Sequence, residues 1–356
     1  MPLVAHYDLP TFERLRAEGQ TVLPPELALH QDIRELHIGL LNMMPDGALT
    51  ATERQFFRLI GQSNKIAQFY VHPFTLPELP RSAEAEAYIR RYYRPIDEVR
   101  SEGLDALIIT GANITQPDLC AEPFWKPLAE IIDWACESVT STLCSCLATH
   151  AVLRLRYGIE RRRLRAKRWG VFTHQVIEPR HPLVRDVNTR FDVPHSRFND
   201  ISRQQFESAG LRVLAASESA GVHLATSEDG FRVVFLQGHP EYDTTSLLKE
   251  YKREVHLFAY GGRLDYPPFP ERYLSPQARA ILEEYRDQVI DALDRGEEIP
   301  PFPEDLVAPR LDNTWHDTAE AIVNNWVGSI YQITHPERKL PFMEGVDPKN
   351  PLGLAF

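Results

Sequence analysis

The strongest constraint on the fold is the alternation of short apolar runs with amphipathic segments between residues 35 and 156. Each apolar run has the length of a strand, and each segment between two runs has apolar residues on one face, as a helix does. Strands and helices that alternate at this spacing favour a parallel sheet covered by helices on both faces. We expect strands at 35–42, 65–72, 104–110 and 139–145, and helices at 52–62 (capped by Thr52), 83–93, 124–138 and 147–156.

The second half of the chain follows a different pattern. Residues 170–238 contain several β-rich runs with few helical signals, which predicts an antiparallel extension leading back to a last core strand. Further helices are expected at 243–260, with Asp243 as N-cap, at 276–296 and at 312–333. We therefore divide the chain into an N-terminal arm (1–33), a catalytic α/β domain (34–262), a Pro-flanked helical insertion (263–311), and a C-terminal helix and tail that pack on the core (312–356).

Composition excludes several classes of protein. A hydrophobic share of 43% against 25% charged residues is ordinary for a folded soluble chain. The net charge of −11 disfavours nucleic acid and anionic membranes as partners. The apolar runs are too short to span a membrane, and the N-terminus lacks the apolar core of a secretory signal. We therefore expect a cytoplasmic protein without nucleic-acid or membrane partners.

Cysteine and histidine spacing gives no sign of a metal or a disulfide framework. The four cysteines are too few to staple a chain of 356 residues, and Cys144 and Cys146 form a C-x-C without the paired spacing of a zinc site. No H-E-x-x-H occurs among the 13 histidines. We expect no metal.

One basic run departs from the acidic average of the chain. It comprises Arg154, Arg156, Arg161, Arg162, Arg163, Arg165, Lys167 and Arg168. One interpretation is a solvated helix end and loop. The other is a docking surface for a phosphate-bearing cofactor, because guanidinium groups pair bidentately with phosphate.

Cys146 is the candidate nucleophile. It follows directly after an expected strand and precedes an expected helix, so its thiol lies at a strand–helix elbow. A helix N-terminus lowers the pKa of such a thiol, and a nearby imidazole can take its proton. His239 in "QGHPEY" follows another strand, and Glu241 can fix the tautomer of its imidazole. The alternative is a buried structural cysteine with a histidine bonded to a backbone carbonyl.

Two backbone amides are candidates for an oxyanion hole: that of Leu147, which follows the thiol, and that of Ala112 in the turn after the neighbouring strand. Cys144 is a rival nucleophile on the same face of its strand. His150, one helical turn after Cys146, is a rival base, although a side chain there is expected to pack against the sheet.

At these residues the chain resembles the homoserine O-acyltransferase family of methionine biosynthesis, of the homoserine O-succinyltransferase type. The matching stretches are "LNMMP" (41–45), "TERQFFRLI" (52–60), "LIITGA" (107–112), "VTSTLCSCLATHAVL" (139–153), "YGI" (157–159), "VPHSRFND" (193–200), "GHPEYD" (238–243) and "NNWVGSIYQIT" (324–334). The resemblance implies a flavodoxin-like, class I glutamine amidotransferase-like three-layer sandwich, with a mainly parallel sheet and here a helical C-terminal insertion.

The resemblance also implies a ping-pong acyl transfer with small-molecule substrates. Cys146 takes the acyl group from an acyl-CoA co-substrate, and His239, oriented by Glu241, then activates the hydroxyl of L-homoserine. The family's amino-acid-binding lysine, serine and arginine fall on Lys167, Ser196 and Arg253. No bound cofactor is implied, and the family suggests a homodimer.

Thr115 occupies the position that separates acyl donors in the family, where glutamate goes with acetyl and glycine with succinyl groups. Thr115 carries no charge to repel a succinyl carboxylate, and its hydroxyl can donate a hydrogen bond to it. We therefore expect succinyl-CoA, with acetyl-CoA as the alternative. Asp46 and Gly47 stand where the family usually has a lysine, which changes the charge of the acyl pocket.

Other functions and another acceptor stay open. The Cys–His–Glu set also fits a glutaminase-type amidotransferase or hydrolase, although that group generally has G-x-C-x-G around the cysteine and this chain has "CSCLA". A non-catalytic binding protein is the third alternative. Serine is one methylene shorter than homoserine, a difference worth only about 1–3 kcal/mol in a pocket, so the acceptor is not fixed by the sequence.

Overall fold

The computed structural model describes residues 3–63 and 67–355. Within these residues the strands form one 11-stranded sheet in the order β2-β1-β4-β3-β5-β6-β11-β10-β9-β7-β8. The strands are β1 (Leu3–Val4), β2 (Val22–Leu23), β3 (Glu35–Leu41), β4 (Gln68–Phe74), β5 (Ala106–Ile109), β6 (Ser141–Ser145), β7 (Arg162–Val176), β8 (Arg190–Asp200), β9 (Arg212–Ser217), β10 (Gly221–Thr226) and β11 (Val233–Leu236). The strand expected at 65–72 is β4, and residues 65 and 66 lie outside the described residues.

The sheet changes direction at β11. All neighbouring strands from β2 to β11 pair in parallel, and those from β11 to β8 pair antiparallel. The apolar runs thus form the parallel part, and the β-rich stretch after residue 170 forms the antiparallel extension, as expected. The β7–β8 hairpin closes this end of the sheet.

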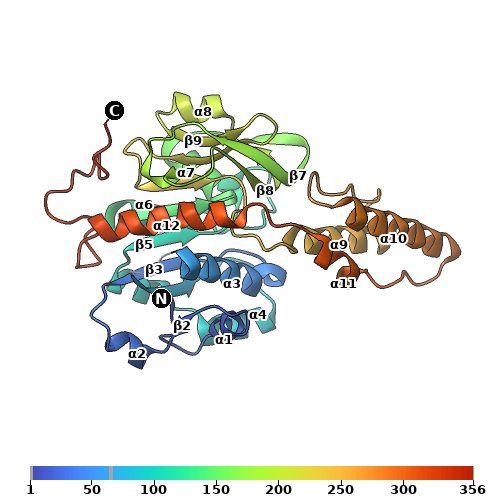
Figure 1. The fold of residues 1–356 in the computed structure, drawn as a ribbon, viewed down its shortest axis with the longest axis horizontal. Coiled ribbons are helices and arrows are strands. Elements are labelled where there is room, and N and C mark those ends of the chain that lie inside the picture. Colours follow the sequence, from blue (N-terminus) through green and yellow to red (C-terminus); the bar gives the residue numbers. More distant parts are fainter. Residues whose placement is uncertain (1–2, 64–66, 356) are drawn as a thin grey trace.

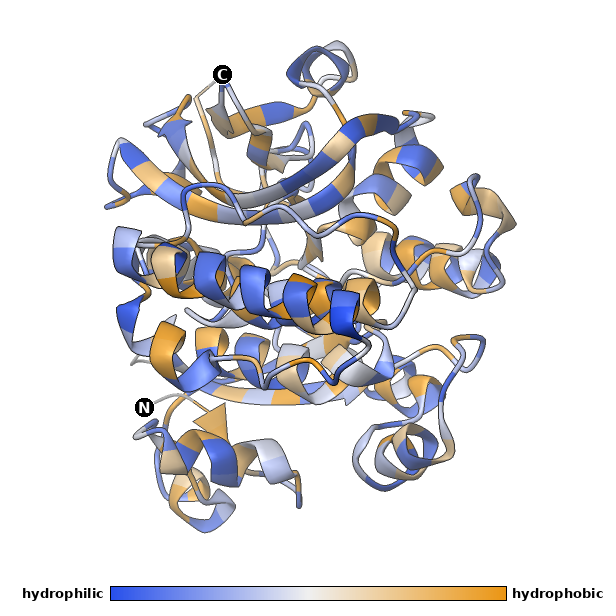
Figure 2. Cartoon of the chain, turned by 90° about the vertical axis from the view of Figure 1, so that its right-hand side faces the viewer, coloured by the Kyte–Doolittle hydropathy of each residue, from blue (hydrophilic) through white to orange (hydrophobic). Residues whose placement is uncertain are grey.

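Helices cover both faces of the sheet, so the predicted α/β three-layer architecture is confirmed. On one face α3 and α12 pack in a cluster that includes Phe56 and Trp326, and on the other α6 and α7 pack in a cluster that includes Leu128 and Val152. Figure 2 shows hydrophobic and hydrophilic residues side by side on the helices, as expected of elements with one buried face. The helices are α1 (Pro10–Ala17), α2 (Pro25–Leu29), α3 (Asp46–Ser63), α4 (Ala83–Tyr92), α5 (Ile96–Glu102), α6 (Trp125–Ser138), α7 (Leu147–Tyr157), α8 (Arg203–Ser208), α9 (Ser246–Ala259), α10 (Pro276–Arg295), α11 (Glu304–Val307) and α12 (His316–Ile333), with short 3₁₀ turns at Leu119–Ala121, Pro182–Val184 and Ala308–Arg310.

Two expected helix caps were wrong. Helix α3 begins at Asp46, so Thr52 is buried inside the helix. Helix α9 begins at Ser246, after Thr245. Asp243 lies further upstream, and its carboxylate instead accepts hydrogen bonds from Arg54 and Arg58 of α3. In that position the carboxylate holds the loop after β11 against α3.

The ends of the chain attach to the sheet in different ways. The N-terminal arm adds two strands to the sheet edge, since β1 pairs with both β2 and β4. The insertion projects to one side of the molecule, where α10 and α11 lie beside α9 (Figure 1). Tyr251 of α9 and Leu282 of α10 belong to one buried cluster there. The residue boundaries of the four parts remain a prediction.

Candidate active site

Three neighbouring parallel strands bring the candidate residues together. Ile109 at the end of β5 pairs with Cys144 in β6, and Ser145 at the end of β6 pairs with Leu236 at the end of β11. The loops after these strands therefore leave the sheet at the same edge, where α/β proteins bind ligands. The Cys146 N–H donates to Leu236 O at 2.8 Å. A Cβ built on Gly111 would lie 3.7 Å from Cys146 Cβ.

Cys146 forms a strained elbow between β6 and α7. Its backbone has φ 53° and ψ −108°, a region that costs a residue with a side chain about 1–3 kcal/mol. The turn leaves the thiol partly exposed, whereas the strand before it is buried. Leu147 is the first residue of α7, so its N–H has no acceptor within the helix. The elbow thus presents a thiol beside a free amide.

His239 and Glu241 form a buried pair beside this thiol. His239 Nδ1 lies 2.8 Å from Glu241 Oε1, and the imidazole stacks on the Tyr242 ring with centroids 4.4 Å apart. Burial alone would lower the pKa of His239. The charge of Glu241 and the Cys146 sulfur, which also shares a hydrogen bond with the imidazole, outweigh burial and raise this pKa well above its ordinary value. The pair therefore favours a protonated imidazole beside Cys146.

The rival residues have other roles. Cys144 is completely buried, and burial raises the pKa of its thiol well above the ordinary value, so the thiol stays protonated. His150 packs against the sheet as expected, with Nε2 3.0 Å from Gln237 Oε1, and burial lowers its pKa to about 4. Neither residue is available as nucleophile or base.

Two of the three predicted amino-acid-binding side chains meet at one carboxylate. Lys167 Nζ of β7 lies 3.0 Å from Glu250 Oε2, and Ser196 Oγ of β8 donates to the same oxygen at 2.6 Å. Tyr242, which stacks on His239, donates to Glu250 Oε1 at 2.7 Å. Burial would raise the pKa of Glu250, but Lys167, Ser196 and Tyr242 outweigh it and hold the pKa below its ordinary value. Glu250 is thus an ionised carboxylate that forms the hub of these contacts, and the Tyr242 ring lies between it and His239. The sequence analysis did not identify Glu250.

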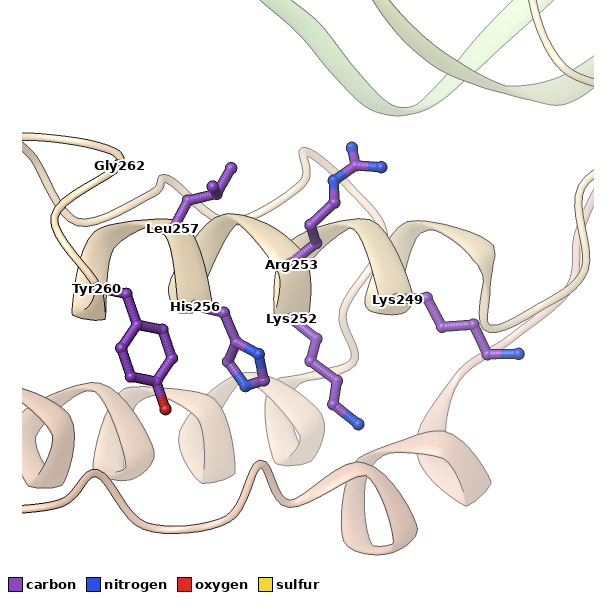
Figure 3. A pocket seen from close by; sticks show the side chains of 7 residues that line it. All are labelled: Lys249, Lys252, Arg253, His256, Leu257, Tyr260 and Gly262. Atoms are coloured by element: carbon purple, nitrogen blue, oxygen red, sulfur yellow. The ribbon is translucent and has the colours of Figure 1, made fainter. Parts of the chain in front are cut away.

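Among the described residues, no hydrogen bond or ion pair joins Arg253 to this hub. It lies one turn after Glu250 on α9, its side chain is 61% exposed, and its nearest carboxylate is Glu254 at 3.8 Å. Arg253 lines a groove of about 440 Å³ along α9, where Figure 3 shows it pointing away from the side taken by Lys252 and His256. Its predicted role remains a prediction.

The loop after β5 is organised by a buried carboxylate. Glu122 accepts hydrogen bonds from the N–H groups of Thr115 and Gln116 and from the Thr115 hydroxyl, at 3.2 Å for the last. Ala112 lies on the same loop, next to Gly111. The Thr115 hydroxyl, which we expected to be free for an acyl carboxylate, is therefore already engaged within the protein.

The basic run lies largely on a strand, because β7 begins at Arg162. Five of its members pair with a carboxylate: Arg154 with Glu160, Arg156 with Asp133, Lys167 with Glu250, and both Arg162 and Arg168 with Asp200. Much of the run therefore serves local ion pairing. Among the described residues, no group of three or more His, Cys, Asp or Glu side chains is arranged to hold a metal ion, and no helix has the length and apolar character to cross a membrane.

A thiol at a strand–helix elbow, beside a His–Glu pair at the carboxyl edge of an α/β sheet, defines the class of enzymes that use a cysteine for acyl transfer or hydrolysis. Within that class, the family model described as homoserine O-succinyltransferase matches residues 2–336. The chain belongs to the homoserine O-succinyltransferase family.

The names of the relatives agree with this match. The chain is 69% identical to the homoserine O-succinyltransferase of Nitrosococcus oceani, over 99% of both chains, and 69% identical to that of Allochromatium vinosum, over 100% of this chain and 99% of the other. Among solved structures, it is similar to a glutamine amidotransferase from Thermotoga maritima (TM-score 0.45, 13% identity, 83% of this chain and 97% of the other) and to one from Methylobacillus flagellatus (TM-score 0.43, 12% identity, 83% and 95%). The family assignment rests on the sequence matches.

Proposed function

We propose that the protein transfers a succinyl group from succinyl-CoA to the hydroxyl of L-homoserine through an acyl-Cys146 intermediate. The observation that carries the proposal is the juxtaposition of the Cys146 elbow with the His239–Glu241 pair: the Cys146 N–H bonds to Leu236, at the end of the strand that leads to His239, and His239 is held by Glu241. The names of the relatives supply the substrates, and the elbow supplies the covalent route. Acyl-CoA acts as a co-substrate and leaves as CoA, so it is not a resident cofactor.

In the first half-reaction, the Cys146 thiolate attacks the thioester carbonyl carbon. The carbon–sulfur bond to CoA breaks, and the His239 imidazolium gives its proton to the CoA thiolate. The N–H groups of Leu147 and Ala112 are the proposed donors to the transient oxyanion, which such donors stabilise by several kcal/mol. The products are CoA, neutral His239 and succinyl-Cys146.

In the second half-reaction, neutral His239 takes the proton of the homoserine hydroxyl. The hydroxyl oxygen attacks the acyl carbon, and Cys146 leaves as a thiolate beside the imidazolium. Lys167, Ser196 and Arg253 are the proposed binding groups for the amino acid, and the guanidinium of Arg253 suits its carboxylate. The resting ion pair is thereby restored.

Intact-protein mass spectrometry tests the covalent route. Succinyl-CoA without homoserine is expected to add one succinyl mass to Cys146, and subsequent homoserine is expected to remove it. The Cys146→Ser variant serves as the control and is expected to stay unmodified. An unmodified Cys146 in protein that nevertheless forms O-succinylhomoserine contradicts the proposal.

A kinetic matrix tests the substrates. Succinyl-CoA with homoserine is expected to give the highest kcat/KM among the combinations of succinyl-CoA or acetyl-CoA with homoserine or serine. Ammonia release from glutamine is the readout that favours a glutaminase instead. The homodimer and the cytoplasmic location implied by the family are part of the proposal, and sedimentation equilibrium of the purified protein tests the first.

A further inference from the structure

The free carboxylate of a succinyl donor needs a cationic partner in the protein. Succinyl and acetyl donors share the reacting thioester and differ in a carboxylate two methylenes beyond the carbonyl. A carboxylate desolvated without a partner costs several kcal/mol, so a site that accepts succinyl groups has to supply a counter-charge. The question rests on the proposed function and concerns the same site.

The loop that follows β5 and carries Thr115, called the acyl-side loop below, is held by a buried carboxylate. Glu122 is 5% exposed and already takes the N–H and the hydroxyl of Thr115. An arriving carboxylate would therefore meet a like charge behind this loop and no free hydroxyl at Thr115. The counter-charge has to come from another element.

Two arginines around the nucleophile already pair with carboxylates of the protein, Arg81 with Asp46 and Arg197 with Asp200. Arg197, within electrostatic range of Cys146, bonds to His195, to Asp200 and to two backbone carbonyls. Arg81 donates to the Met44 carbonyl and to the Thr75 hydroxyl, and it pairs with Asp46 at 3.3 Å. Met44 lies near the nucleophile, since a Cβ built on Gly111 would lie 3.5 Å from Met44 Sδ. Neither guanidinium is free to receive a substrate carboxylate.

Arg161 differs from both. The chain leaves α7 through Gly158, in the left-handed conformation, and turns back, so that Arg161 Nη2 lies 3.5 Å from Pro117 O on the Thr115 loop. Its Nη1 is buried and has no hydrogen-bond partner, and no carboxylate of the described residues lies within ion-pair distance of it. Burial lowers the pKa of Arg161, while the charges of Glu122, Asp118 and Cys146 oppose that shift. The group thus lies against the loop that carries Thr115, with an unused donor.

We propose that Arg161 binds the free carboxylate of the acyl group and so sets the preference for succinyl over acetyl donors. Its unpartnered Nη1 is the donor, and its contact with the Pro117 carbonyl places the guanidinium against the loop that carries Thr115. The basic run therefore contains two residues proposed to serve substrates, Arg161 for the acyl donor and Lys167 for the amino acid, beside others that form ion pairs within the protein.

The test varies the charge of the acyl donor and the charge of the side chain at position 161 independently. The donors are succinyl-CoA, its neutral carboxamide analogue succinamoyl-CoA, and acetyl-CoA, each with saturating homoserine. Arg161→Gln is expected to lower kcat/KM for succinyl-CoA about 10- to 100-fold, the worth of a charged hydrogen bond, while the values for the two neutral donors change little. Arg161→Lys is expected to recover part of the loss. Arg165→Gln, an exposed arginine of strand β7, which begins directly after Arg161, is the matched control and is expected to leave all three values unchanged.

The outcomes separate the two levels of the proposal. If Arg161→Gln lowers kcat/KM equally for all three donors, or for none, the assignment of Arg161 is overturned while the acyl transfer stands. If wild-type protein gives no succinyl-Cys146 with succinyl-CoA, the proposed function itself fails. Thermal melting of each variant identifies a general loss of folding, and the ratio of the succinyl-CoA to the succinamoyl-CoA value remains the deciding quantity for any variant that folds.

Discussion

At the scale of single residues, the charge of the buried His239 depends on one carboxylate. Burial disfavours the imidazolium, so the proton stays only because Glu241 and the Cys146 sulfur compensate for the lost water. Glu241 uses Oε1 for this contact, and its buried Oε2 has no hydrogen-bond partner among the described residues. The pair is therefore more sensitive to the charge of Glu241 than an exposed pair would be.

Glu241→Gln keeps the size of the side chain and removes the charge. Because Glu241 raises the pKa of His239, its loss is expected to lower that pKa, so the imidazolium is lost at a lower pH. The alkaline limb of kcat/KM for succinyl-CoA is expected to shift to lower pH, with a decrease in kcat of about 10²- to 10⁴-fold. A pH–rate profile of both proteins measures the shift, and an unchanged alkaline limb would contradict it.

Glu250→Gln tests the hub that positions Lys167 and Ser196. Without the charge, Lys167 loses its ion pair and Ser196 its strongest acceptor, so both proposed binding groups become disordered relative to His239. The KM for homoserine is expected to rise about 10- to 100-fold, while succinylation of Cys146 in the absence of homoserine continues. Glu284→Gln, at an exposed position of α10, is the control. Equal loss of both half-reactions would show that Glu250 supports the whole site.

The candidate triad could be predicted because its signal is local. Each member follows directly after an apolar run, and parallel strands put their carboxyl ends at one edge. Glu250 carries no such signal, since it is one of several charged residues on an amphipathic helix. Its role arises from three partners on β7, β8 and the loop after β11, which meet it only in the folded chain. The contact of Glu122 with Thr115 likewise forms only in the folded chain, so no sequence pattern indicated it.

At the scale of elements, the insertion is bonded to the sheet at a position where only a glycine leaves enough space. Gly170 of β7 has φ 146°, and a Cβ there would lie 2.2 Å from Glu271 O. The neighbouring Val171 N–H donates to the same carbonyl at 2.9 Å, and Glu271 N–H donates to Trp169 O at 2.8 Å. The segment before α10 is thus bonded to the strand that carries Lys167.

Gly170→Ala is expected to lower the free energy of unfolding by about 1–3 kcal/mol, because the methyl group collides with backbone and the conformation is strained. Gly328→Ala in α12 is the matched control: nothing lies within 4 Å of its added Cβ, and alanine favours a helix. Urea denaturation measures both. A Gly170→Ala protein as stable as the wild type would show that the bridge to Glu271 can shift at little cost.

Element types followed from the sequence better than element ends did. Apolar periodicity depends on burial of a whole face, so it identified β3, β5, β6 and the helices α3, α4 and α6, but not the short α5. Caps depend on single residues whose side chains also have tertiary partners. Asp243 illustrates this, because two arginines of α3 take its carboxylate. Strands β1 and β2 have two residues each, too few for any periodicity to indicate them.

At the scale of the whole molecule, buried histidines make stability depend on pH. His6, His37 and His72 form one cluster, in which ring centroids lie 4.8 Å (His6–His72) and 5.2 Å (His37–His72) apart. Burial is the largest cause that lowers their pKa values, to about 4 for His6 and His37 and about 2 for His72. The unfolded chain therefore binds protons below about pH 6.5 that the folded protein does not take up.

Since the unfolded state binds more protons there, the free energy of unfolding is expected to fall as the pH drops from about 6.5 toward 4, by up to roughly 1.4 kcal/mol per pH unit for each such histidine. His72→Gln removes one titrating group and is expected to flatten this slope. His30→Gln, at an exposed position, is the control. Urea denaturation at pH 7, 6 and 5 measures the slopes, and an equal slope in wild type and His72→Gln would contradict the assignment.

The layered architecture of the molecule was predictable because alternating strands and helices permit few arrangements. The side chosen by the insertion was not, because it depends on the Gly170 bridge and on the Tyr251 cluster, which join segments distant in sequence. Sequence pattern thus defines the layers, and individual contacts define what is attached to them.

The backbone conformation at Cys146 presents the thiol for the proposed reaction but lowers the stability of the folded protein. A residue without a side chain would adopt that conformation at no cost, yet it would remove the thiol on which the proposed acyl transfer depends. A lineage released from the need for this reaction could gain robustness by a single replacement there. The cost of keeping a side chain at this position therefore falls on the stability of the protein.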